Sequence, residues 1–404
     1  MTIKDLYVII ASGVKLKNNK ILKGDFKMSE EMKNVNEQPT ETPVEKKPLD
    51  KKTLGIIIGA VAAVVILAVV LIVALGGNST PAGPTEQEYT LGMGAVVSIN
   101  DTNAQVDGTI AAVVLDKDGV IVHCYVDAIQ NKVTINEDGT FTIGNTKTKR
   151  ELGYDYNMSK FGHSLVGNET VKEWFEQADA FEAWCVGKTI AQVKAMGTQT
   201  MDNGYVISKD EALLGAGCTI SITDFIDAVV KAGNDDQKAT FKTAGTITLG
   251  LAINSADSGS AAATSEKDGA IQVYSDFAAT ALVDGKIVAS LNDAIQPKTT
   301  FDATGAITGT SFKGTKRELK EDYNMSKFGH SLVGNETVKE WYLQSAAFSA
   351  HIVGMTSAQV DGMATQTMDN GYVISNDDAL LGAGCTMSID GIIDVVVKSI
   401  ANAQ

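Results

Sequence analysis

Two short loops of small residues hold the side chains best suited to chemistry. Leu214–Thr219 reads Leu-Gly-Ala-Gly-Cys-Thr, and Leu381–Thr386 repeats it without change. Small residues let a ligand approach the backbone, and the amino end of a following helix favours a phosphate group. A tight connection between a strand and a helix, with no ligand, accounts for the same residues. Both interpretations stay open at this point.

The four cysteines are a second candidate site. Cys218 and Cys385 recur in the two loops, whereas Cys124 and Cys185 occur in one copy only. A thiol at a helix amino end can have a lowered pKa and act as a redox sensor. The alternative is a small buried hydrophobic side chain. Outside a cell, Cys124–Cys185 or Cys218–Cys385 could form a disulfide, and the sequence does not decide between these options.

His163 and His330 each precede a serine, Ser164 and Ser331 respectively. Adjacent side chains rarely face each other, so we interpret the histidines as loop residues and predict no catalytic residue. The chain has no metal-ligand spacing such as HExxH or an EF-hand loop, and we predict no metal site.

The loops belong to a long internal repeat. Asp155–Trp174 is identical to Asp322–Trp341, at an offset of 167 residues. That period is far longer than the repeat of a solenoid, so each copy should be a domain. We predict domain 1 at 89–233 and domain 2 at 240–404.

Each copy has a sheet before its helices. Thr109–Leu115 and Val120–Val126 predict one hairpin, and 132–135 with 140–143 predict a second around a turn ending in Gly139. Apolar spacing predicts a helix from Val171 to Cys185, capped by Asn168 or Thr170. Shorter helices are expected at 190–196 and from Thr223 or Asp224 to Lys231. This order predicts an α+β fold for both tandem domains.

The Gly-Ala…Thr loops resemble the flavin-attachment motif of the bacterial FMN-binding domain. That motif has an acidic residue, two further residues, then Ser/Thr-Gly-Ala-Ser/Thr-x-Thr and a helix. Glu211 or Asp378 takes the acidic place, Gly215-Ala216 or Gly382-Ala383 the Gly-Ala place, and Thr219 or Thr386 the attachment place. The chain departs from the motif in having Leu214 or Leu381 and Gly217 or Gly384 where the family has Ser or Thr.

The resemblance implies two FMN-binding-like domains that carry FMN covalently through Thr219 and Thr386, with Gly215, Ala216, Gly382 and Ala383 beside the cofactor. Members of the family occur in a subunit of sodium-pumping quinone reductases and in membrane-anchored extracellular electron-transfer proteins. Trp174, Trp341, Tyr156 or Tyr323 could stack on the flavin ring, although core packing is the favoured explanation for these aromatic residues.

A membrane segment precedes the repeats. Leu54–Leu75 has no polar or charged side chain and is long enough to cross a bilayer, so we predict a transmembrane helix at 54–76. Lysines lie before it and none follows at once, which places the N-terminus in the cytoplasm and the bulk outside. Residues 1–53 should form a disordered cytoplasmic tail, and 77–88 a stalk.

The net charge indicates which partners the chain is suited to bind. The chain has 34 Lys and Arg against 49 Asp and Glu, a net charge of −15, which argues against a nucleic-acid partner. We expect membrane lipid as a partner through 54–76. The resemblance favours an extracellular FMN-binding electron-transfer protein with a membrane redox donor. The alternative is a non-enzymatic surface binding or structural protein without flavin.

Overall fold

The computed structural model describes residues 85–161, 171–328 and 338–404. They form a mixed fold of helices and strands, and all of these described residues belong to one compact unit. The predicted tail, the membrane helix, residues 77–84 of the stalk, and both histidines with their serines lie outside the described residues. Within the described ranges, no helix is long and apolar enough to cross a membrane.

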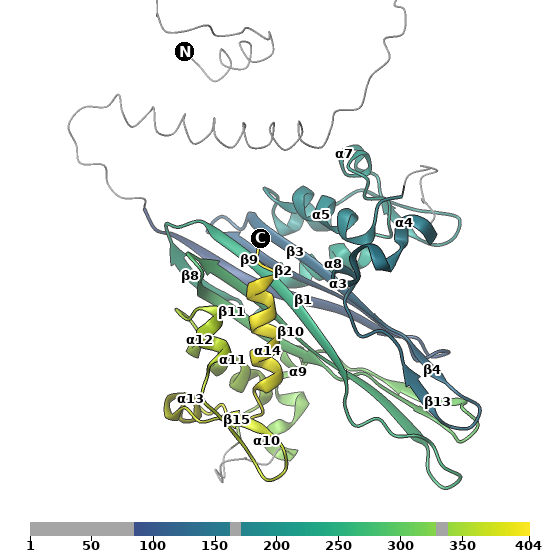
Figure 1. The fold of residues 1–404 in the computed structure, drawn as a ribbon. Coiled ribbons are helices and arrows are strands. Elements are labelled where there is room, and N and C mark those ends of the chain that lie inside the picture. The colour runs from purple at the N-terminus through teal and green to yellow at the C-terminus, as the bar shows by residue number, and fades with distance from the viewer. Residues whose placement is uncertain (1–84, 162–170, 329–337) are drawn as a thin grey trace, which may run out of the picture. The chain divides into compact units, whose positions relative to one another are not determined.

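The first repeat opens with an antiparallel sheet (Figure 1). Its strands are β1 (Gln87–Ile99), β2 (Val106–Asp116), β3 (Ile121–Asn131) and β8 (Ala239–Thr243), in the order β3-β2-β1-β8. The remaining elements are β4 (Val133–Ile135), β5 (Phe141–Ile143), α3 (Lys149–Leu152), η1 (Gly153–Tyr156), α4 (Met158–Phe161), α5 (Trp174–Cys185), α6 (Ile190–Lys194), β6 (Thr198–Thr200), β7 (Val206–Ser208), α7 (Glu211–Gly215) and α8 (Thr223–Asn234).

The second repeat follows the same order. Strand β10 (Gly269–Val283) pairs with β9 (Ile247–Asp257), β11 (Lys286–Ile295) and β12 (Lys298–Phe301), and β12 pairs with β13 (Ile307–Ser311). The remaining elements are α9 (Lys316–Leu319), η2 (Lys320–Tyr323), α10 (Met325–Phe328), α11 (Trp341–His351), α12 (Ser357–Asp361), β14 (Thr365–Thr367), β15 (Val373–Ser375), α13 (Asp378–Gly382) and α14 (Asp390–Ala401).

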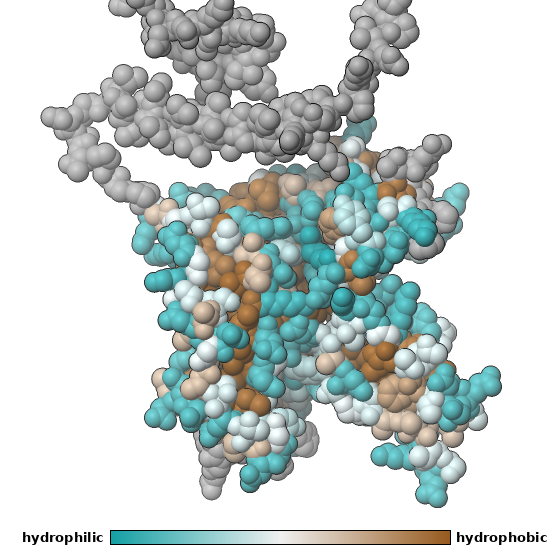
Figure 2. Space-filling view, in the orientation of Figure 1, coloured by the Kyte–Doolittle hydropathy of each residue, from teal (hydrophilic) through white to brown (hydrophobic). Residues whose placement is uncertain are grey.

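The elements pack as four layers: helices, sheet, sheet, helices. Helices α5 and α8 cover one face of the first sheet, and α11 and α14 cover one face of the second (Figure 1). The other two faces meet in a shared core that includes Ile110, Val114, Leu251 and Phe277. Both sheets are therefore buried on both faces, which explains why Thr109–Leu115 is almost continuously apolar. Hydrophilic residues border narrower hydrophobic areas on the face shown in Figure 2.

The two repeats also exchange matching polar contacts. Lys231 of α8 binds Glu318 of α9 at 2.8 Å, and Lys398 of α14 binds Glu151 of α3 at 2.8 Å. Each lysine belongs to one repeat and its carboxylate to the other, so the contact is reciprocal, as in a two-fold dimer. The repeats thus dock on each other with the geometry of two like subunits.

Glycines set the distance between helix and sheet. A Cβ at Gly92 would lie 2.0 Å from the carbonyl oxygen of Ala232, and one at Gly250 would lie 1.8 Å from that of Ser399. These positions are equivalent in β1 and β9, so glycine is required where α8 and α14 cross the strands. This explains the repeated Thr-Leu-Gly of the two strands.

Both predicted hairpins of the first repeat are confirmed. The predicted start of the long helix was wrong. Helix α5 begins at Trp174, so Val171 lies outside it. Glu173 is the N-cap residue and forms a capping box with Glu176. Helix α8 begins at Thr223 as predicted but continues to Asn234. Strand β8 then begins at Ala239, at the end of the segment between the two predicted domains.

The shared core predicts coupled unfolding. Phe277 is fully buried between the sheets, and Phe277→Ala should lower the free energy of unfolding by about 3–5 kcal/mol. Urea unfolding followed by tryptophan fluorescence should stay a single transition, since both repeats lose the same core. Two separate transitions, with only the second repeat destabilised, would contradict it. Tyr205→Ala, at an exposed side chain, is the control.

Candidate functional site

The Gly-Ala…Thr segment is not a simple loop before the last helix. It begins with a short helix, α7, and Gly215 is that helix's last residue. The chain then turns at Gly217, with a φ of +90°, and α8 starts at Thr223. The second copy matches, with a φ of +89° at Gly384. This left-handed backbone favours glycine, which gives a physical reason for the departure from Ser or Thr at this place.

A lysine lies across each turn. The Lys172 ammonium donates a hydrogen bond to the Ala216 carbonyl at 2.7 Å, and Lys339 donates to Ala383 at 2.8 Å. A Cβ at Gly217 would come within 2.7 Å of the Lys172 side chain. The alkyl stem therefore covers the inner side of the turn, where a larger residue would collide with it.

The candidate attachment threonines are held from inside the fold. Thr219 is 4% exposed and its N–H donates to Gln177 Oε1 at 2.8 Å. Thr386 is 5% exposed and its N–H donates to Gln344 Oε1 at 2.8 Å. The Gln177 amide in turn donates to the Lys172 carbonyl at 2.8 Å. Each glutamine thus ties the threonine segment to the first turn of α5 or α11.

The six candidate flavin-binding residues separate into two environments. Gly215, Ala216 and Gly382 are exposed, as is Ala383, and a Cβ on either glycine would meet no atom within 4 Å. The two threonines are buried. A cofactor that lies on the exposed residues would therefore reach a threonine hydroxyl only after the segment around it moved.

The cysteines are buried as well. Burial raises the pKa of both Cys218 and Cys385 to about 12, the opposite of the lowering that a reactive thiol needs. The pKa of Cys124 is raised by a hydrogen bond with Cys185 and by burial. All four cysteines are free thiols. Cys218 lies in the helix–sheet core of the first repeat and Cys385 in that of the second, so the environment matches small hydrophobic residues.

The four aromatic residues that could stack on a flavin differ in burial. Trp174 and Trp341 are buried in the two helix–sheet cores. Trp174 meets Phe225 edge to face, with ring centroids 5.4 Å apart. Tyr156 and Tyr323 are half-buried. Of these four rings, Tyr156 borders a cavity of the first repeat.

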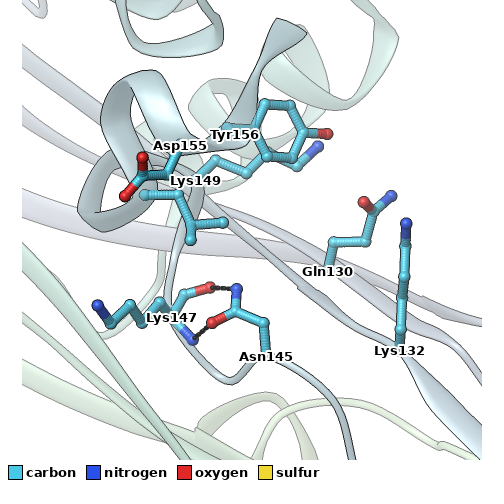
Figure 3. Close-up of a pocket in the computed structure, with 8 residues that line it drawn as sticks. Gln130, Lys132, Asn145, Lys147, Lys149, Asp155 and Tyr156 are labelled. Atoms are coloured by element: carbon cyan, nitrogen blue, oxygen red, sulfur yellow. Dashed lines mark hydrogen bonds between the residues drawn. The ribbon is translucent and has the colours of Figure 1, made fainter. Parts of the chain in front are cut away.

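This cavity has a volume of about 270 Å³ and opens between the end of β3 and helix α3. It is lined by Gln130, Lys132, Asn145, Lys147, Lys149, Leu152, Asp155 and Tyr156. In Figure 3, Lys149 lies beside Tyr156, across the cavity from Gln130 and Lys132. Asn145 exchanges hydrogen bonds with the backbone of Lys147 at 3.1 and 3.2 Å, which fixes the loop that carries this lysine.

The repeated acidic residue next to this cavity has a structural role. Asp127 accepts hydrogen bonds from the N–H groups of Ala128 and Arg150 at 2.7 and 3.2 Å, and so joins β3 to α3. Asp293 accepts equivalent bonds from Ala294 and Arg317 at 2.7 and 2.9 Å. Burial raises the pKa of each carboxyl to about 6. The repeated Asp-Ala-Ile-Gln and Thr-Lys-Arg-Glu-Leu segments are thus two halves of one contact.

Sequence reasoning missed the residues that organise both places: Gln177, Gln344, Lys172 and Lys339 at the threonine segments, and the lysines of the cavity. A signal was available, because Lys172 lies in the identical block and Gln177, which lies between the apolar residues Trp174 and Phe181 of its helix, recurs as Gln344. Among the described residues, no group of three His, Cys, Asp or Glu side chains could hold a metal ion.

Comparison with protein-family models, curated proteins and solved structures finds no match for this chain. The residues and their geometry therefore carry the functional argument alone.

The buried amide of Gln177 gives a test of the threonine segment. Gln177→Leu removes the acceptor of the Thr219 N–H and the donor to Lys172, and should lower the free energy of unfolding by about 2 kcal/mol. Chemical denaturation measures this loss. Gln366→Leu, at an exposed strand position, should change stability by less than about 0.5 kcal/mol. Equal effects of the two changes would contradict the assigned role.

The raised pKa values of Asp127 and Asp293 predict a pH dependence. Since both carboxyls bind protons more tightly when folded, the stability they contribute is complete below about pH 4 and is lost as pH rises through about 6. Asp127→Asn keeps an acceptor oxygen and should reduce the stability gained between pH 7 and 4 by about 2–3 kcal/mol. Urea midpoints across this range measure it. A profile unchanged from that of the exposed control Asp202→Asn would contradict the prediction.

Proposed function

We propose that the chain is a membrane-anchored extracellular binding protein without enzymatic activity, in which the two repeats act as one unit. The observation that supports this proposal is the environment of Thr219 and Thr386. Both residues are buried, and their N–H groups donate hydrogen bonds to Gln177 and Gln344. In this function the small residues form structural turns. The apolar segment 54–76 would hold the protein in the lipid bilayer, with residues 1–53 in the cytoplasm and both repeats outside.

A second candidate is the extracellular electron carrier with FMN on Thr219 and Thr386. The specific observation in its favour is the exposed surface of Gly215 and Gly382, beside which a planar cofactor has room. Electron transfer would then belong to the flavin ring, and the protein would position it and receive electrons from a membrane donor. Attachment would require each threonine segment to leave its glutamine, so that the threonine hydroxyl became accessible.

Intact mass and a visible spectrum of the full-length protein, purified in detergent from its native host, separate the two candidates. The binding function predicts an unmodified mass and a colourless protein, because both threonines remain buried. Added FMN mass with a flavin spectrum would overturn it, provided that Thr219→Ala and Thr386→Ala remove the addition. Thr200→Ala and Thr367→Ala, at equivalent exposed positions of the two repeats, are the matched controls.

A further inference from the structure

We propose that the cavity of the first repeat binds an organic phosphate, with the phosphate groups on the lysines and the organic part against Leu152 and Tyr156. This inference rests on the proposed binding function and names its ligand class. The cavity volume of about 270 Å³ is near the lower end of small-molecule sites. Its location follows from the fold, because β3, the segment before α3, and η1 each contribute part of the wall.

Charge is the first argument. Lys132, Lys147 and Lys149 border the cavity, whereas Asp155 is the one carboxylate among its lining residues. In the described part of the chain, none of the three ammonium groups lies in an ion pair with a carboxylate. The Asp224 carboxyl also interacts with Lys149. Among the lining residues themselves, three ammonium groups face one carboxylate, and this excess of positive charge in a chain with a net charge of −15 attracts an anion.

The second repeat provides the comparison. There Lys316 replaces Lys149, and its ammonium lies 4.6, 4.9 and 5.2 Å from the ring centroids of Tyr274, Tyr323 and Trp341. It also donates a hydrogen bond to the Tyr274 hydroxyl at 3.0 Å. Lys316 is buried, and burial lowers its pKa to about 8, against the attraction of Asp276 and Asp293. Its ammonium thus already faces aromatic rings and carboxylates of the protein.

The first repeat has no counterpart of Tyr274, one of the three aromatic residues around Lys316. Ile110 pairs with Asp127 as Phe277 pairs with Asp293, so the position of Tyr274, three residues earlier, corresponds to Asp107. The Asp107 carboxylate accepts hydrogen bonds from Gln105 and Gln130. Lys149 therefore has two rings beside it, Tyr156 at 5.2 Å and Trp174 at 5.5 Å, and remains half-buried at the cavity.

The side-chain chemistry fits a phosphate. A lysine ammonium binds phosphate as a point charge, whereas planar carboxylate recognition is typical of the arginine fork. Three ammonium groups on two segments, with Lys132 after β3 and Lys147 and Lys149 at the start of α3, suit a ligand with more than one negative charge. Leu152 and the Tyr156 ring offer an apolar surface for a planar organic group.

Calorimetric titration of the full-length protein in detergent with adenosine diphosphate and with inorganic pyrophosphate tests the site. Both probes should bind at low salt and weaken at high salt. Lys132→Gln with Lys147→Gln should weaken both roughly tenfold. Lys298→Gln with Lys313→Gln, exposed lysines around the same hairpin of the second repeat, should leave affinity within about twofold. Tyr156→Leu should reduce adenosine diphosphate binding to the pyrophosphate level.

Failure of both probes to bind would overturn the inference, as would equal weakening by the two lysine pairs. If Tyr156→Leu left the affinity for adenosine diphosphate unchanged, the proposed contact between Tyr156 and the organic part of the ligand would be wrong. Each of these results is separate from the mass and spectrum that test the proposed function. A flavin on Thr219 or Thr386 would defeat that function while the titration still reported on the cavity.

Discussion

The apolar layer between the two sheets is the interaction on which the remaining structure depends. Each sheet already packs its own helices on one face, and its other face is equally apolar. Left alone, either repeat would expose an extended hydrophobic surface to water, which a soluble domain rarely tolerates. The partner repeat removes that surface, so the pairing of repeats is a condition of stability.

The reciprocal contacts follow from this layer. Once the sheets face each other, the end of α8 meets α9, and the end of α14 meets α3, which gives the ion pairs of Lys231 and Lys398. The segment that connects the repeats also contacts the second repeat. Arg317 donates hydrogen bonds to Asp235 at 3.0 Å and to the Gln237 carbonyl at 3.1 Å. The segment between α8 and β8 is therefore part of the packed structure.

Local patterns in the sequence predicted much of the fold but little of the site. Turn residues between apolar runs predicted both hairpins, and the start of α8 at Thr223 was also found. The face-to-face packing of sheets could not be read from one chain, because an apolar run such as Thr109–Leu115 indicates burial without naming what covers it. The recurrence of Gln177 as Gln344 marks this residue in the sequence, but its contact with Thr219 and that of Lys149 with Trp174 join separate segments, and residue spacing does not identify such partners.

Duplication explains how one scaffold can hold a closed and an open version of the same site. The framework residues Asp127 and Asp293 make matching bonds, so α3 and α9 stand at the same place on their sheets. The residues around them then differ: Tyr274 lies over Lys316, whereas Asp107 leaves Lys149 beside a cavity. Lys147 of the cavity lining also corresponds to Gly314 in the second repeat. Since the shared core fixes both sheets, changes at these positions alter the site without altering the fold that supports it.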